Sequence, residues 1–215
     1  SSDLMIGAKR ISGAEIRHVI PRYDWTANTV YNAYDNLTDS LDLHNTRFYV
    51  VTSDWNVYKC LSNNYGAVSN VMPTSTATIA DFQTTDGYIW KYMYTISSEE
   101  QLRFVTEDYI PVKTLSVNDG SLQWQVQKNA VKGGIHNITL TNKGTGYSSN
   151  NITVAIIGDG QDAAAYAVRN TQSNIIDTIV VTNRGINYTY ANVAIISTSG
   201  TGAVARAIIS PSGGR

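Results

Sequence analysis

The sequence predicts a mainly β protein, an α+β fold with few short helices, in which a sheet-rich first domain precedes a duplicated β sandwich-like module. Charged residues make up only 15% of the 215 residues, against roughly 25% in average globular proteins. Polarity comes instead from Asn, Ser, Thr and Tyr, which favour strands and turns. Several segments alternate with the period of a strand, and a unit of about 40 residues is repeated near the end. We therefore place the two domains at 1–134 and 135–215.

Composition excludes several classes of partner. The formal net charge of −1 leaves no surplus of basic residues for a nucleic-acid binder. No apolar run approaches the ~18 residues of a membrane helix, and no charged-then-apolar leader follows Ser1. We expect no nucleic-acid partner, no membrane contact and no secretion signal. Because the chain starts without Met, we also expect a fragment or a trimmed product.

Local signals define the first elements of the chain. Ser12 and Glu15 have the spacing of a capping box, which predicts a short helical turn. The segment 26–36 is rich in turn formers and tyrosine, and it fits a short helix or an irregular stretch equally. Runs of β-branched and aromatic residues then predict strands at 47–52 and 55–61, joined by a two-residue turn.

The strongest strand signal is the segment 88–96. A period of two places five side chains on one face: Tyr88, Trp90, Tyr92, Tyr94 and Ile96. The other face receives Ile89, Lys91, Met93 and Thr95. An aromatic stripe of this kind can stack bases or bind sugar, or it can form a core or a subunit contact. Because no cluster of Arg or Lys accompanies the stripe, we favour the core or subunit contact.

The rest of the first domain carries weaker signals. Ser97 and Glu100 form a second capping box, which predicts a short helix over 99–104. Extended chain returns at 108–112. After an Asn-Asp-Gly hairpin signal, strict alternation over 121–127 predicts another strand. Its inward-facing residues would be Leu122, Trp124 and Val126.

A duplication occupies the second domain. The segment 141–147 (TNKGTGY) recurs as 182–188 (TNRGINY), and the segment VAII follows each copy, at 154–157 and 193–196. Both copies close on alternating alanines, which are Ala163, Ala165, Ala167, Ala203, Ala205 and Ala207. Each unit predicts a strand, a Gly turn, a tyrosine, a strand, a Gly loop and a strand. Units of this length bury a face by packing on each other.

We assign no catalytic, cofactor-binding or metal-binding residue. Cys60 is the only cysteine and lies in a predicted strand, so we interpret it as a small buried side chain. The three histidines, His18, His44 and His136, lack the spacing of a zinc site.

Two loop motifs are interpreted as structural. The segment 158–163 fits the dinucleotide motif G-x-G-x-x-A, but a strand with alternating alanines follows it where that fold needs a helix. We therefore expect its glycines to permit positive φ in a turn. Asp159 and Asp162 lack the spacing and the bidentate Glu of an EF-hand calcium loop.

Four segments of the first domain occur together in an order typical of one family. They are 20–31 (IPRYDWTANTVY), 54–61 (DWNVYKCL), 86–94 (DGYIWKYMY) and 109–112 (YIPV). Over roughly residues 18–113 the chain resembles the family of baseplate wedge subunits, numbered eight, of T4-like contractile-tailed phages. The repeats at 135–215 resemble β modules of many phage structural proteins.

The resemblance implies a structural subunit without enzymatic activity, cofactor or small-molecule substrate. Such a subunit forms a homodimer and contacts other wedge subunits in the baseplate of the virion, after assembly in the bacterial host cytoplasm. One alternative is a carbohydrate-binding or receptor-recognising tail module, motivated by the tyrosines and the β repeat. A second is a wall hydrolase, for which we can name no pair of carboxylates set across a cleft.

Overall fold

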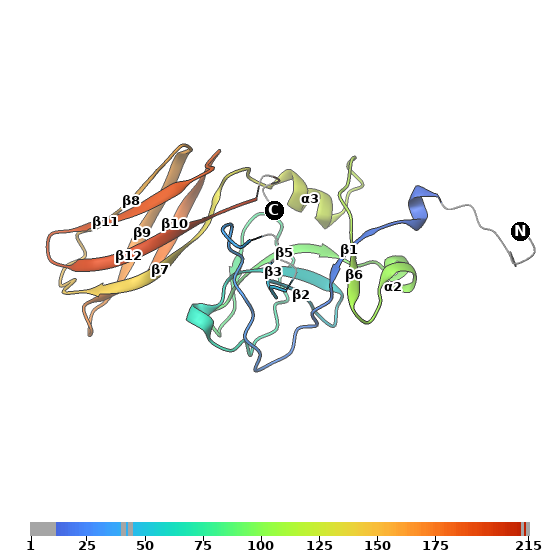
Figure 1. Cartoon of the computed structure of the whole chain (residues 1–215), viewed down its shortest axis with the longest axis horizontal. Helices are drawn as coiled ribbons and strands as arrows, with labels where there is room; N and C mark the ends of the chain where they lie inside the picture. Colours follow the sequence, from blue (N-terminus) through green and yellow to red (C-terminus); the bar gives the residue numbers. More distant parts are fainter. Residues whose placement is uncertain (1–11, 40–41, 43–44, 212, 214–215) are drawn as a thin grey trace, which may run out of the picture.

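The computed structural model describes residues 12–39, 42, 45–211 and 213, and it confirms the mainly β fold class. Figure 1 shows the sheet of the first half on the right and a second set of strands on the left. In the first half the strands are β1 (His18–Pro21), β2 (Tyr49–Val51), β3 (Asn56–Ser62), β4 (Phe82–Gln83), β5 (Ile89–Thr95) and β6 (Tyr109–Val112). In the second half they are β7 (Ile135–Thr145), β8 (Ile152–Gly158), β9 (Gln161–Asn170), β10 (Ile175–Ile186), β11 (Ala191–Ser197) and β12 (Thr201–Ile209).

An antiparallel sheet of order β2-β3-β5-β4 forms the centre of the first half, and β1 pairs separately with β6. The predicted strands at 47–52, 55–61, 88–96 and 108–112 correspond to β2, β3, β5 and β6. The four segments that carry the family resemblance supply β1, β3, β5 and β6. The resemblance therefore lies on the core of the first half.

The aromatic residues of β5 are buried in this core. Trp90 is 0% exposed, stacks on Tyr88 with ring centroids 5.4 Å apart, and meets the Tyr31 ring edge-on at 5.9 Å. Tyr58 of β3 packs edge-on against Tyr92 at 5.9 Å. Buried rings are inaccessible to a base or a sugar, so the interpretation of the stripe as a core is confirmed.

The predicted division of β5 into two faces is wrong beyond Tyr92. Val57 pairs with Tyr94 and Tyr58 with Tyr92, so a bulge leaves Met93 without a residue of its own opposite it. Met93 and Tyr94 consequently pack in one apolar cluster, separate from that of Trp90. The alternation of the sequence continues through 88–96, but the bulge changes the face to which the side chains point.

The predicted strand at 121–127 is also wrong, because α3 (Leu122–Lys128) is a helix. Ser121 caps it by accepting a hydrogen bond from the Trp124 amide. The Gln123 amide side chain donates to the Lys113 carbonyl at 2.6 Å. Val126 is buried, whereas Leu122 is 40% exposed. In a helix, residues two apart do not share a face. The expected inward-facing set of Leu122, Trp124 and Val126 is therefore wrong.

Both capping boxes are confirmed. Ser12 and Glu15 open the short 3₁₀ helix η2 (Gly13–Glu15), and Ser97 and Glu100 open α2 (Ser98–Phe104). The Ser97 hydroxyl accepts from the Glu100 amide while the Glu100 carboxylate accepts from the Ser97 amide. The undecided segment 26–36 is irregular and contributes only an isolated bridge.

In the second half, strands of one predicted repeat pair with strands of the other. β7 and β8 of the first repeat pair with β12 and β11 of the second, and β10 pairs back with β9. The alternating alanines face the shared interior as expected from their spacing. Every ladder in the described residues joins strands on the same side of residue 134. The division into domains at that residue stays a prediction.

The repeated Gly and Tyr residues have equivalent roles. Tyr147 and Tyr188 follow the two Gly turns and are 1% and 5% exposed. Gly200 and Gly160 lie against their rings, where an added Cβ would come within 2.3 Å and 2.4 Å of ring carbons. A glycine from one repeat therefore leaves room for the tyrosine of the other.

Trp90→Ala is expected to lower the free energy of unfolding by about 3–5 kcal/mol, because it opens a large cavity among buried rings. The indole Nε1 has no hydrogen-bond partner among the described residues, so Trp90→Phe should cost clearly less. Urea denaturation followed by circular dichroism measures both. Equal stability of Trp90→Ala and the wild type would contradict the assignment of Trp90 to the core.

Gly200→Ala is expected to destabilise the second half by about 1–3 kcal/mol through overpacking against the Tyr147 ring. Gly13→Ala is the matched control, since a Cβ there meets nothing within 4 Å. The same urea titration compares the two variants. A loss no larger than that of the control would show that the Tyr147 ring moves aside freely.

Candidate interaction surface

Ion pairs of Arg206 and Arg184 link the two halves of the chain. Arg206 of β12 donates from Nη1 to the Asp35 carboxylate at 2.8 Å, and a second contact through Nη2 makes the pair bidentate. The hydrogen bond from Arg206 holds the pKa of Asp35 below its usual value. Arg184 of β10 pairs with Asp81 just before β4, and burial lowers the pKa of that guanidinium. These contacts fix β10 and β12 against the first half.

Apolar and backbone contacts complete the junction. Ile208 of β12 is 3% exposed and packs with Tyr34 and Phe48, whose rings meet edge-on at 5.6 Å. The Ile209 amide donates to the Asn36 side chain at 3.0 Å. The Asn137 side chain of β7 donates to the Leu61 carbonyl at 3.3 Å. The junction therefore combines burial with directional bonds.

Buried cationic side chains lie next to this junction. Lys59 of β3 and Lys91 of β5 are directly opposite each other and are 0% and 6% exposed. The Lys59 ammonium lies 3.5 Å from the centroid of the Tyr34 ring, a close cation–π contact. Burial, reinforced by the charge of Lys91, lowers the pKa of Lys59 well below its usual value.

His136 of β7 meets the same Tyr34 ring edge-on, with centroids 6.2 Å apart. It is 7% exposed, and neither ring nitrogen has a hydrogen-bond partner among the described residues. Burial, with the charges of Lys59 and Lys91 nearby, lowers the pKa of His136 to about 2. The imidazole is therefore neutral at physiological pH.

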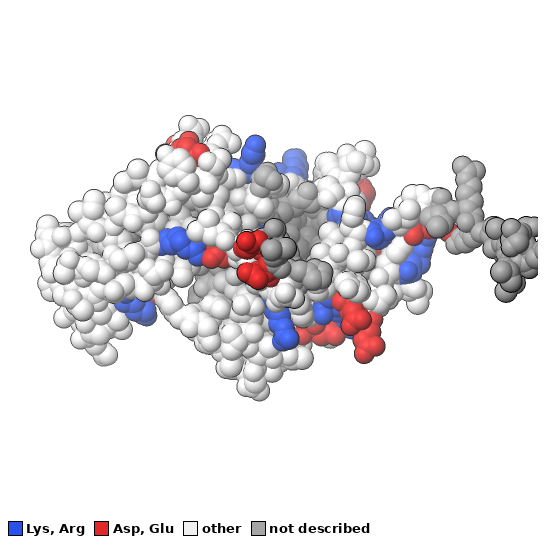
Figure 2. Space-filling model, in the orientation of Figure 1, with Lys and Arg blue, Asp and Glu red and all other residues white. Residues whose placement is uncertain are grey.

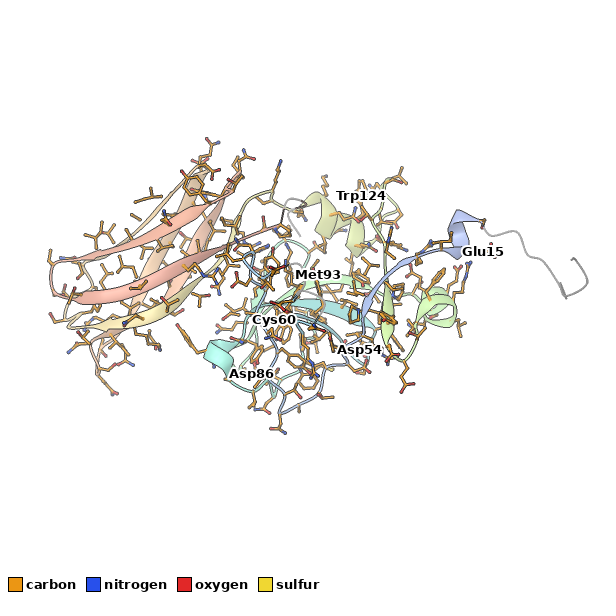
Figure 3. The ribbon with its side chains drawn as sticks, in the orientation of Figure 1. Glu15, Asp54, Cys60, Asp86, Met93 and Trp124 are labelled. Atoms are coloured by element: carbon orange, nitrogen blue, oxygen red, sulfur yellow. The ribbon has the colours of Figure 1, made fainter. Side chains whose placement is uncertain are left out.

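A third contact point involves η3 (Asn64–Gly66), which Asp86 holds in place from the loop beside it (Figure 3). Tyr65 donates its hydroxyl to the Asp177 carbonyl of β10 at 2.8 Å. Lys143 lies over the Tyr65 ring and pairs with the Asp177 carboxylate at 3.1 Å. The Tyr65 ring is still 54% exposed.

The outer surface of the second half is poor in free charge. Arg169 donates to Asn150 and to the Tyr147 carbonyl, and the Asp159 carboxylate accepts from the backbone of Thr189 and Tyr190. The other Lys and Arg residues of these strands form the ion pairs described above; they are Lys143, Arg184 and Arg206. Figure 2 shows few charged side chains over this part of the molecule, on the left.

Large apolar side chains are exposed on that surface. They include Ile157 of β8, Tyr166 and Val168 of β9, Val180 of β10, Ile196 of β11 and Val204 of β12, which are between 36% and 59% exposed. Uncharged apolar surface of this kind is typical of protein–protein contacts. We regard this outer surface as the candidate functional site.

One cleft in the first half is lined by Met93, Tyr94 and Gln123 among others, with a volume of about 130 Å³. Ligand sites usually measure about 300–1,000 Å³. Its lining contains neither a histidine nor a carboxylate.

The residues singled out in the sequence do not converge on one site. Cys60 is 0% exposed within the first sheet, and burial raises the pKa of its thiol, as expected for a structural side chain (Figure 3). His18 lies on β1 and His136 at the junction, while His44 lies outside the described residues. No group of three or more His, Cys, Asp or Glu in the described part of the chain could hold a metal ion.

Residues 159–160 connect β8 to β9, which belong to different sheets, so a strand and not a helix follows the motif, as the turn interpretation expected. The expected role of the glycines is wrong, because neither Gly158 nor Gly160 has a positive φ. The Asp159 carboxylate accepts hydrogen bonds from the Thr189 hydroxyl and from the Thr189 and Tyr190 amides, between β10 and β11, and these bonds lower its pKa to about 2. None of the helices in the described ranges is long and apolar enough to span a bilayer. The charge pairs of the junction were not anticipated, because nothing in their spacing marks them.

Comparison with protein-family models, with curated proteins and with solved structures finds no match to the chain. The resemblance to wedge subunits thus stays a prediction from four sequence segments.

His136→Leu is expected to flatten the dependence of stability on pH. The unfolded state binds a proton near pH 6.5 and the native state only near pH 2. The free energy of unfolding therefore falls as pH drops below about 6.5, by up to about 1.4 kcal/mol per unit from this residue. Urea titrations between pH 7 and pH 5 measure the slope, with the exposed His18→Leu as control. Identical slopes in His136→Leu and the wild type would contradict a buried neutral imidazole.

Proposed function

We propose that the chain is a structural subunit of a contractile phage tail baseplate, where it forms wedge protein–protein contacts and has no enzymatic activity. It acts as a homodimer with other wedge subunits as partners, in the virion, after assembly in the host cytoplasm. No nucleic acid, membrane, small-molecule substrate or cofactor takes part. The proposal starts from the four ordered segments of the first half.

The observation that carries the proposal is the exposed apolar surface of the second half. The Lys and Arg side chains of its strands bind groups within the chain, whereas Tyr166, Ile157 and Ile196 are half exposed or more. Leaving such side chains in water is unfavourable, and covering them contributes about 25 cal/mol per Å². Permanent assemblies use uncharged, apolar contact surfaces of this type.

A second candidate is a carbohydrate-binding or receptor-recognising tail module. The observation that favours it is the exposure of two tyrosines of the repeats, Tyr166 at 50% and Tyr190 at 58%. Aromatic rings presented on a β scaffold can pack against sugar faces. Titration of the chain with glycans distinguishes this candidate, since a specific complex of millimolar affinity or tighter would favour it over the wedge subunit.

The proposal predicts a dimer that persists on dilution and binds the other wedge subunits of the same genome. Light scattering across a concentration series measures the solution mass, and a pull-down with the purified wedge subunits measures binding. A trimer would indicate a fibre or an adhesin instead. A chain that captures none of the wedge subunits would contradict the proposal, whatever its mass.

A further inference from the structure

The two repeats present equivalent outer faces to different environments. In the ladder of β12 with β7, Arg206 lies opposite Thr139 and Ile208 opposite Asn137. In the ladder of β9 with β10, Tyr166 lies opposite Val180 and Val168 opposite Thr178. In the repeat, Ala165 and Ala167 correspond to Ala205 and Ala207. Tyr166 therefore takes the position equivalent to Arg206, and Val168 the position equivalent to Ile208.

The first half of the chain covers one of these two faces. Arg206 binds Asp35, Ile208 is buried against Tyr34 and Phe48, and Asn137 bonds to the Leu61 carbonyl. The repeat unit therefore has an outer face that is suited to docking, and in the β7–β12 ladder this face is occupied.

The equivalent face is open. We call it the β9–β10 face, and it consists of Ala164, Tyr166, Val168, Thr178 and Val180. Tyr166 is 50% exposed, Val168 37% and Val180 36%. None of these residues is charged, and the position of Arg206 is taken here by Tyr166. A partner for this face needs no acidic residue.

We infer that the β9–β10 face is a docking surface for a second copy of this chain, arranged about a two-fold axis. Such an axis brings the same patch of each copy together. An uncharged face can meet itself without like-charge repulsion, whereas an Arg at its centre could not. The inference rests on the proposed homodimeric role and assigns it a surface.

The face is also continuous with the internal junction. Asp177, which receives the Tyr65 hydroxyl, directly precedes Thr178 of the β9–β10 face. The half-exposed Tyr65 ring of the first half is thus available to extend the contact beyond the two strands. A standard-size interface buries about 800 Å² per partner, and the Tyr65 ring adds contact area to that of the five residues of the face.

Tyr166→Arg tests the inference, because Arg206 shows that the equivalent strand position accepts an arginine. The matched control is Tyr190→Arg, which changes a similarly exposed tyrosine outside the face. We expect the wild type and Tyr190→Arg to be dimers by light scattering. The dissociation constant of Tyr166→Arg should rise at least about 100-fold, because two guanidinium groups are forced together. Thermal unfolding and circular dichroism check that both variants fold.

Dimers of equal affinity in all three proteins would overturn the inference and leave the proposed function standing, with its contact on another face. A wild type that is monomeric throughout the series would overturn the inference as well. The pull-down with wedge subunits then decides the proposed function separately, since it does not require the second copy.

Discussion

The pairing of strands between the two repeats is the constraint on which the rest of the structure depends. Either repeat alone would leave ladder groups unpaired and its alanine face in water, so the two form one unit. β7 directly follows the first half of the chain. Because β12 pairs with β7, β12 also lies beside the first half. Arg206 and Ile208 reach Asp35 and Tyr34 only through this pairing.

The first sheet in turn makes specific contacts with β7. Lys59 and Lys91 lie within a nearly dry environment, and Tyr34 links Lys59 to His136 of β7. Replacing buried cations by well-packed apolar side chains is often neutral or stabilising, because the desolvation of a charge is costly. The arrangement instead requires one particular approach of β7, since the Tyr34 ring must meet an ammonium group and an imidazole at once.

The capping boxes at Ser12 and Ser97 and the main strands of the first sheet were predicted correctly from signals within a few neighbouring residues. The repeat was found by comparing two segments of the sequence with each other. The bulge at Met93 could not be predicted, because it is defined by the register with β3. The helix α3 shows the same limit, since Gln123 gains its partner from Lys113 only in the folded chain. The outer surface could be located only after the ladders showed which repeat positions are covered.

The distance along the chain between β7 and β12 also sets an order of events during synthesis. β7 leaves the ribosome long before its partner strand exists, and contacts between distant segments form slowly. Throughout that interval Ile138 and Leu140 lack the strand that covers them, and Asp35 lacks its guanidinium. A chain that ended before β12 would leave the apolar face of β7 exposed to water. Chaperones and proteases recognise exposed apolar surface of this kind. Translation through Ile209 therefore completes the ladder that covers the apolar face of β7.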